Sequence, residues 1–316
     1  MVKDVVVAGI DIGGTNTVCG LTDKSGAILA REGFKTNSCS QFPHFVEKVA
    51  SSVTAMAGRL GVSFAGIGIG APNANYYTGE INDAANLLWK GTLHLKRDME
   101  AATGVPVTIT NDANAAAVGE MIFGAARGMK DFIMLTLGTG VGSGIVANGR
   151  VVYGKTGLAG ELGHVIMTDN GRSCGCGRKG CLEAYASATG VARTAVEFLA
   201  RPGVKSSLSE ITGSEINSWH VARHAEAGDP VALEVFDFTA RMLALAITNA
   251  VLFSSPEAII LAGGLAKSGN LLKKPLEKYV EEFIMPNFRN SFKIISTGLP
   301  ESDAAILGAA ALVINQ

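Results

Sequence analysis

Four residues with the chemistry of metal ligands lie close together in one glycine-rich stretch of the sequence. Cys174, Cys176 and Cys181 are spaced C-x-C-x4-C, and the glycines among them let the backbone fold tightly around one point. His164 precedes them, and three thiolates with one imidazole form a closed tetrahedral zinc set. A disulfide with one spare thiol is the alternative. No signal peptide is apparent, so we expect a reduced, cytoplasmic compartment and a structural zinc ion.

Two carboxylates bracket this metal-binding stretch. Glu161 and Glu183 lie just outside the first and last ligand, so a metal that closes the loop would bring them to one place. A histidine bound through one ring nitrogen presents the other in a fixed direction. Glu161, His164 and Glu183 together could therefore bind a polyhydroxylated molecule.

Glycine turns follow three predicted strands, and two of the turns belong to an internal repeat. Asp11-Ile12-Gly13-Gly14-Thr15 follows strand 5–10, and a run that begins Gly138-Thr139-Gly140 follows strand 132–137. Residues 10–15 align with residues 135–140, and a second glycine turn follows in each copy. Successive amides in such turns can bind phosphate oxygens. Only the first copy has an acid, Asp11, which could face a metal ion.

The third glycine turn, Gly263-Gly264, follows strand 258–262 and could pass close to a flat ligand. A further acid, Asp112, follows Asn111 at the start of a predicted helix over residues 113–123. The helix dipole favours the ionised form of an acid at this position, which suits a proton acceptor. The alternative is that Asp112 is an ordinary N-cap.

Further elements are predicted around these motifs. Residues 17–21 and 27–34 complete the first meander, and strand 64–70 contains GIGIGA, which fits a dinucleotide fingerprint. We reject that interpretation because a loop with Pro72 and Gly79 follows where the fingerprint requires a helix. Helices are expected over residues 45–60, 93–103, 184–200, 214–227 (capped by Ser214), 230–253, 271–284 and 304–313, and strands over residues 105–110 and 293–296.

Composition narrows the class of partner. The 316 residues carry a formal net charge of −1 and are 47% hydrophobic, with scattered basic residues. We therefore expect a folded protein that binds neither nucleic acid nor membrane. A sugar or another small metabolite is the expected ligand.

The three turns, the duplicated meander and the isolated acid at a helix start resemble the actin, hexokinase and Hsp70 superfamily. Within it, DIGGT, TNDANAAA, LGTGVGSG, GELGH and CGCGRKGCLE resemble the ROK family of bacterial sugar kinases and sugar-responsive repressors. The resemblance covers nearly the whole chain. It implies an α/β, ribonuclease H-like, duplicated two-domain fold with a central ATP and sugar cleft. We expect domains at residues 1–114 and 115–303, with a final helix packing back on the first.

The resemblance also implies a function for each motif. The chain would be an ATP-dependent, cytoplasmic hexose kinase with Asp112 as general base. The sugar hydroxyls would be bound by Asn111, Glu161, His164 and Glu183. The ATP phosphates would be bound by Gly13, Gly14, Thr15, Gly138, Thr139 and Gly140, and the adenosine by Gly263 and Gly264. Asp11 would reach Mg2+ through water, and zinc would orient His164. A homodimer is expected because family members commonly dimerise.

Glucose is the expected substrate because residues 86–91, NLLWKG, are similar to a segment of the glucokinases. That segment departs from the commoner NLPGW form, and GAPNANYYTG at residues 70–79 departs from the usual GxPG loop. Fructose, N-acetylglucosamine, N-acetylmannosamine and allose therefore stay open. The alternatives from other classes are a sugar-sensing repressor, disfavoured because the phosphate-binding strand starts by Val5, and a non-catalytic sugar-binding protein.

Overall fold

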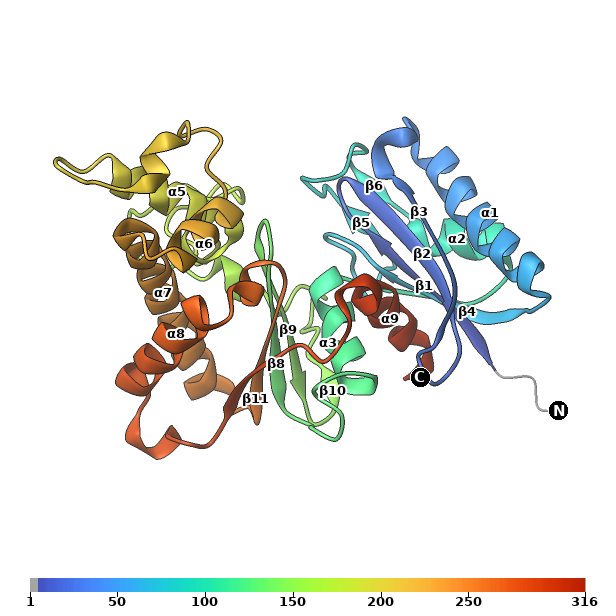
Figure 1. Cartoon of the computed structure of the whole chain (residues 1–316). Helices are drawn as coiled ribbons and strands as arrows, with labels where there is room; N and C mark the ends of the chain where they lie inside the picture. The colour runs from blue at the N-terminus through green and yellow to red at the C-terminus, as the bar shows by residue number, and fades with distance from the viewer. Residues whose placement is uncertain (1–4, 316) are drawn as a thin grey trace. The chain divides into compact units, whose positions relative to one another are not determined.

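A computed structural model describes residues 5–315 of the chain (Figure 1). The chain separates into two compact units. The first consists of Met1–Lys130, Gly144–Gly160 and Thr297–Gln316, and the second of Asp131–Ser143 and Glu161–Ser296.

The first sheet begins with an antiparallel meander and continues with parallel strands. The meander is β1 (Val6–Ile12), β2 (Asn16–Thr22) and β3 (Ile28–Lys35). β4 (Phe64–Gly70) pairs parallel with β1, and β7 (Val107–Thr110) pairs parallel with β4, so the order is β3-β2-β1-β4-β7. A separate short ladder joins β5 (Ile81–Asn82) to β6 (Thr92–Leu93).

The second sheet repeats this topology. β8 (Phe132–Leu137), β9 (Val141–Ala147) and β10 (Arg150–Val151) form the meander, and β11 (Ala258–Ala262) and β12 (Lys293–Ser296) follow in parallel. The order is β10-β9-β8-β11-β12. In each sheet a three-residue glycine turn separates the first two strands, at residues 13–15 and 138–140. The internal repeat predicted from the glycine motifs and the duplicated α/β fold implied by the family resemblance are therefore confirmed.

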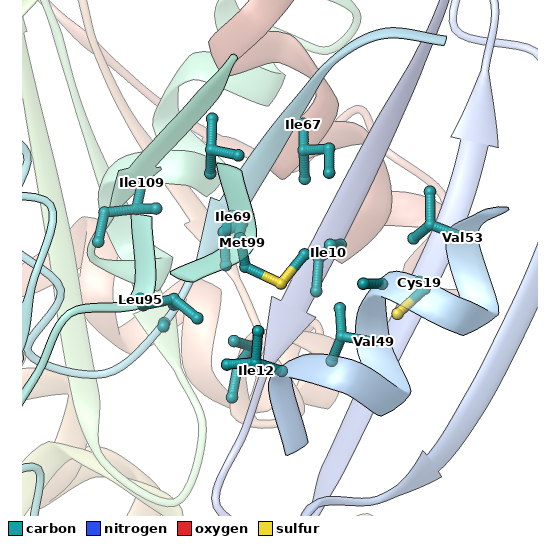
Figure 2. Packing of buried hydrophobic residues seen from close by; sticks show 14 of the residues in the cluster. Ile10, Ile12, Cys19, Val49, Val53, Ile67, Ile69, Leu95, Met99 and Ile109 are labelled. Atoms are coloured by element: carbon teal, nitrogen blue, oxygen red, sulfur yellow. The ribbon is translucent and has the colours of Figure 1, made fainter. Parts of the chain in front are cut away.

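One face of the first sheet carries the branched apolar side chains of the core. Ile10, Ile67 and Ile69 are fully buried against α1 (Phe42–Leu60) and α2 (Leu95–Thr103), as Figure 2 shows. Cys19 belongs to this cluster and is fully buried. Side chains alternate between the faces of a strand, so the intervening residues point to the other side. Burial of each large side chain contributes about 1.5–3 kcal/mol.

The opposite face carries glycines, and a helix lies directly on them. A Cβ atom at Gly68 would lie 1.8 Å from the Ala309 carbonyl oxygen, and one at Gly9 would lie 2.1 Å from that of Ile306. α9 (Glu301–Ile314), drawn red in Figure 1, consequently packs against β1 and β4. The GIGIGA run thus serves helix packing, and a turn at residues 72–73 follows it, as expected for a sequence that is not a dinucleotide fingerprint.

A buried carboxylate fastens the end of α3 (Asp112–Ile122) to distant segments. Glu120 is fully buried, and it accepts hydrogen bonds from the Ala125 N–H at 2.7 Å, the Gly298 N–H at 3.1 Å and the Thr297 hydroxyl. A buried charge is tolerated only when it is bonded in this way. Glu120 thereby joins α3 to the segment that leads into α9.

Two predicted helices begin or end elsewhere in the second unit. The helix expected over residues 184–200 is divided into α4 (Glu183–Ala186) and α5 (Ala188–Leu199), because the Ser187 side chain accepts the Gly190 N–H and caps a new helix. The expected cap Ser214 was wrong, since Asn217 caps α6 (Ser218–Glu226) by accepting the His220 N–H.

The other helical elements are close to their predicted positions or are short turns. They are α7 (Pro230–Ser254), α8 (Asn270–Phe283) and the 3-10 turns η1 (Thr36–Ser38), η2 (Leu162–His164), η3 (Ser207–Glu210), η4 (Leu265–Ser268) and η5 (Pro286–Phe288). Across residues 5–315, none of the helices has the length and apolar character needed to cross a bilayer.

Candidate active site

Parallel pairing brings two acids together at one edge of the first sheet. Asp11 is in register with Gly70 on β4, and Gly70 with Thr110 on β7, just before Asp112. A Cβ atom at Gly70 would lie 3.7 Å from Asp11 Oδ1 and 3.5 Å from the Asp112 Cα. Asp11 and Asp112, far apart in sequence, are therefore neighbours across a glycine. Sequence reasoning gave Gly70 no role, although a glycine at the end of a central strand was a signal of close approach.

The local structure separates the roles of Asn111 and Asp112. Asn111 is the N-cap of α3, since its Oδ1 accepts the Ala113 N–H at 2.9 Å, whereas Asp112 is the first helical residue. The Asp112 Oδ1 accepts the same N–H at 2.8 Å. The alternative that Asp112 is the N-cap is therefore wrong, because Asn111 occupies that position.

The electrostatics differ from the expected effect of the helix dipole. Asp112 reaches solvent, yet protein packed around it removes much of its hydration and raises its pKa, outweighing the backbone hydrogen bonds that act in the opposite direction. The pKa of Asp11 is raised to about 7, first by burial and then by the charge of Asp112. Both acids are therefore favoured in the protonated form, and an ionised Asp112 opposes ionisation of Asp11.

The first glycine turn is held from outside. The Gly13 N–H donates to the Asn16 carbonyl at 2.9 Å, and the Thr36 hydroxyl donates to the Gly13 carbonyl at 2.7 Å. The Thr36 N–H donates to the Thr15 carbonyl at 3.0 Å. Gly14 packs closely, since a Cβ atom there would lie 2.6 Å from the carbonyl oxygen of Asn86. The turn and the start of the NLLWKG segment are consequently in contact.

The four predicted zinc ligands converge. Donor atoms of His164, Cys174, Cys176 and Cys181 all lie within 4.8 Å of one another, and all three cysteines are free thiols. His164 Nδ1 lies 3.7 Å from Cys174 Sγ, and Cys176 Sγ lies 3.6 Å from Cys181 Sγ. Ligands on a tetrahedral zinc with Zn–S bonds of about 2.3 Å are separated by roughly 3.8 Å. The donor set therefore fits a zinc ion, and the sulfur separation excludes a disulfide.

Both bracketing carboxylates lie beside this donor set. His164 Nε2, the ring nitrogen turned away from Cys174, lies 3.9 Å from Glu161 Oε2. Glu183 begins α4; its Oε2 accepts the Val141 N–H at 3.0 Å and its Oε1 accepts the Cys174 thiol at 3.6 Å. Glu183 thus links the metal-binding stretch to the second glycine turn.

The second and third glycine turns are neighbours. A Cβ atom at Gly140 would lie 2.4 Å from Glu183 Oε2, so the turn closes around this carboxylate. Gly263 has a φ of +91° and lies at the end of β11, where a Cβ atom would lie 2.5 Å from the Leu137 carbonyl oxygen. Only glycine fits there without strain. Gly264 follows and is the N-cap of η4.

Comparison with known proteins identifies the family. A model described as ROK family matches residues 7–316. The chain belongs to the ROK family. A glucokinase of Halalkalibacterium halodurans is 36% identical over 98% of this chain and 94% of its own length. The xylose repressor of Bacillus subtilis is 29% identical over 97% of this chain and 76% of its own length.

A solved relative supports the same assignment. The ROK family glucokinase from Streptomyces griseus, in complex with glucose and AMPPNP, superposes with a TM-score of 0.79 and 31% identity, covering 97% of this chain and 98% of that one. These matches confirm the expected family, its actin-like fold and the class of ROK-type sugar kinase. The roles of individual residues and the preferred sugar stay predictions.

Proposed function

We propose that this ROK-type kinase transfers the γ-phosphoryl group of ATP to the 6-hydroxyl of glucose, giving glucose 6-phosphate, ADP and a proton. The observation that carries the proposal is the accessible carboxylate of Asp112 beside Asp11, in a chain with two phosphate-type glycine turns. The glucokinase relatives support glucose as the acceptor.

Asp112 would act as the general base. Phosphoryl transfer needs an aligned hydroxyl and stabilisation of charge on the phosphoryl oxygens, and little covalent chemistry from the protein. An ionised Asp112 accepts the proton of the attacking hydroxyl, and its raised pKa brings its basicity nearer to neutral pH.

The sugar hydroxyls would be bound by Asn111, Glu161, His164 and Glu183. Carboxylates and an imidazole accept hydrogen bonds from hydroxyls and bind a neutral polyol through several such bonds. The metal ligands support this arrangement, since His164 turns Nδ1 towards the thiols and Nε2 towards Glu161. Zinc, when bound, would fix the ring of His164 in that direction.

The nucleotide would be bound by the glycine turns. The phosphates would be bound by the turns Gly13-Gly14-Thr15 and Gly138-Thr139-Gly140. The Gly13 and Gly138 N–H groups close their own turns by bonding to the Asn16 and Gly140 carbonyls, so the amides of the two residues that follow in each turn would bind the phosphate oxygens. Gly263 and Gly264, next to the second turn, would pass close to the adenosine. Asp11, whose acid form is favoured by burial and by Asp112, would ionise in the presence of Mg2+ and bind it through water.

The decisive experiment measures ADP release from purified protein with Mg2+ and ATP against a panel of hexoses. We expect turnover with glucose, and a loss of at least about a thousand-fold with Asp112→Asn while glucose still binds. Asp98→Asn, on the surface of α2, is the matched control and should retain activity. Turnover with another hexose would change only the substrate. Sugar binding without ADP release would overturn the proposed kinase activity. It would favour a sugar-sensing role for this chain, as in a repressor.

A further inference from the structure

The second glycine turn is held by residues that follow the metal-binding stretch. The Ala188 N–H donates to the Gly138 carbonyl at 2.8 Å, and the Thr189 hydroxyl donates to the Thr139 carbonyl at 2.9 Å. Both donors belong to the first turn of α5, which exists as a separate helix because Ser187 caps it. Two successive carbonyls of the turn are therefore bonded to one helix start.

These two bonds determine where the amides of the turn point. In a trans peptide the carbonyl and the following N–H point in opposite directions, and the peptide unit is planar. A Gly138 carbonyl directed at α5 therefore turns the Thr139 N–H away from α5, and the Thr139 carbonyl does the same to the Gly140 N–H. Two consecutive amides are thus directed to one side, which is the geometry of an anion-binding nest.

Thr189 lies beside a buried hydroxyl at the start of the same helix. The Ser187 Oγ lies 2.9 Å from Thr189 Oγ1 and 2.7 Å from the Glu183 carbonyl oxygen, and it accepts the Gly190 N–H at 3.0 Å. Ser187 has no exposed surface, whereas Thr189 is exposed. The Ser187 hydrogen goes to the Glu183 carbonyl and the Thr189 hydrogen goes to the Thr139 carbonyl, so each hydroxyl donates to a different backbone carbonyl.

The first glycine turn is also bonded by a threonine from outside the turn. In the first glycine turn, the Thr36 hydroxyl donates to the Gly13 carbonyl at 2.7 Å from outside the turn. Thr36 lies on η1 after β3, whereas Thr189 lies on α5, so the two threonines occupy unrelated positions in the repeat. Each turn has thus acquired a threonine that bonds one of its carbonyls.

We propose that Thr189 is a positioning residue for the nucleotide phosphates: its bond to Thr139 aims the Thr139 and Gly140 amides at the phosphate oxygens. The proposal deepens the proposed function and rests on the nucleotide role of this turn. Two neighbouring residues would then have different roles, since Glu183 would bind the sugar and Thr189 would position the turn that binds the nucleotide. A change at Thr189 should consequently affect ATP and leave the sugar unaffected.

The test compares Thr189→Val, which loses the hydroxyl and keeps the shape, with Thr189→Ser, which keeps the hydroxyl. Calorimetry with MgATP in the absence of sugar should show about five-fold weaker binding for T189V, the scale of one net hydrogen bond, and near-normal binding for T189S. Thr103→Val is the matched control, because its hydroxyl donates to the Met99 carbonyl at 2.7 Å on α2. The KM for ATP should rise in T189V, with glucose affinity and zinc content unchanged.

Three results would overturn the proposal. They are unchanged ATP binding in T189V, an equal loss in T189S, and a matching loss of glucose affinity, which would indicate general collapse of the site. Failure of the kinase function itself would be seen separately, as ATP binding without sugar phosphorylation in the unsubstituted protein. The calorimetric comparison then still decides the role of Thr189, and a protein that binds no ATP refutes it.

Discussion

Asp11→Asn should make the first unit more stable above neutral pH while it weakens catalysis. Burial and the charge of Asp112 raise the pKa of Asp11 from its ordinary 3.8 to about 7, so the folded protein favours the neutral acid. Because the folded state then binds the proton more tightly than the unfolded chain, stability falls as pH rises from 3.8 to about 7 and is constant above that. Asparagine keeps the shape and removes this titration.

The size of the effect follows from the shift. Each pH unit corresponds to about 1.4 kcal/mol, so a pKa raised from 3.8 to about 7 represents at most roughly 4 kcal/mol of lost stability at neutral pH. Between pH 5 and pH 8 the advantage of the Asp11→Asn variant should grow by about 2.6 kcal/mol. A functional acid that costs stability is typical of a binding site.

The assay is urea unfolding at pH 5, 6.5 and 8, observed through Trp89. This tryptophan is 8% exposed and its ring centroid lies 4.6 Å from that of Phe45, inside the first core. The only other tryptophan, Trp219, lies in the second unit and is 60% exposed. A Trp219→Phe background therefore restricts the signal to the unit that contains Asp11.

Asp23→Asn is the matched control for this prediction. Asp23 lies at the turn after β2, and hydrogen bonds from the Ser25 side chain and nearby amides lower its pKa. Its carboxylate form is thus favoured in the folded state, and D23N should not gain stability at any pH. A stability difference between Asp11→Asn and the parent that did not change from pH 5 to pH 8 would refute the reasoning.

Three further outcomes are expected. Gly68→Ala should lower the free energy of unfolding by about 2–3 kcal/mol in the same assay, because the added Cβ atom would meet the Ala309 backbone. The control Gly33→Ala, where no atom lies nearer than 3.5 Å to the added Cβ atom, should change it by less than about 1 kcal/mol. Equal effects of the two substitutions would contradict the packing argument. The Cys176→Ser variant should bind no zinc and should bind sugar at least about ten-fold more weakly, while the unfolding transition observed through Trp89 stays unchanged. Normal sugar affinity in this variant would mean that the metal serves only thermal stability. The value of kcat/KM should decrease as the pH is lowered, with a midpoint above pH 3.8, because burial raises the pKa of Asp112. A midpoint at or below pH 3.8 would refute the role of Asp112 as a base with a raised pKa.

The sequence was sufficient where chemistry depends on spacing along the chain. The C-x-C-x4-C pattern with His164 predicted a cluster that the fold does bring together, and the repeated glycine turns predicted the duplicated sheets. In both cases the pattern is local or self-similar, so no knowledge of packing was needed. Strand ends were also predictable, since apolar runs ended at glycines.

Contacts between distant segments could not be predicted in this way. The neighbourhood of Asp11 and Asp112 depends on which strands pair, and Gly70 acquires its role only through that pairing. The dipole argument for Asp112 failed because desolvation depends on the surrounding packing, which no local pattern reveals. The cap at Ser187 was missed because one serine inside a helix-forming stretch resembles an ordinary helical residue until its bond to the Gly190 N–H is seen.

The packing of α9 on the glycine face of the first sheet has a consequence for biosynthesis. The strands of the sheet lie between residues 6 and 110, but the helix that covers Gly9 and Gly68 consists of residues 301–314, which are synthesised after the whole of the second unit. A nascent chain therefore carries that face uncovered while almost all of the second unit is being translated. We expect the second unit to become protease-resistant first during synthesis, and stalled chains that end before residue 301 to bind chaperones through the exposed sheet.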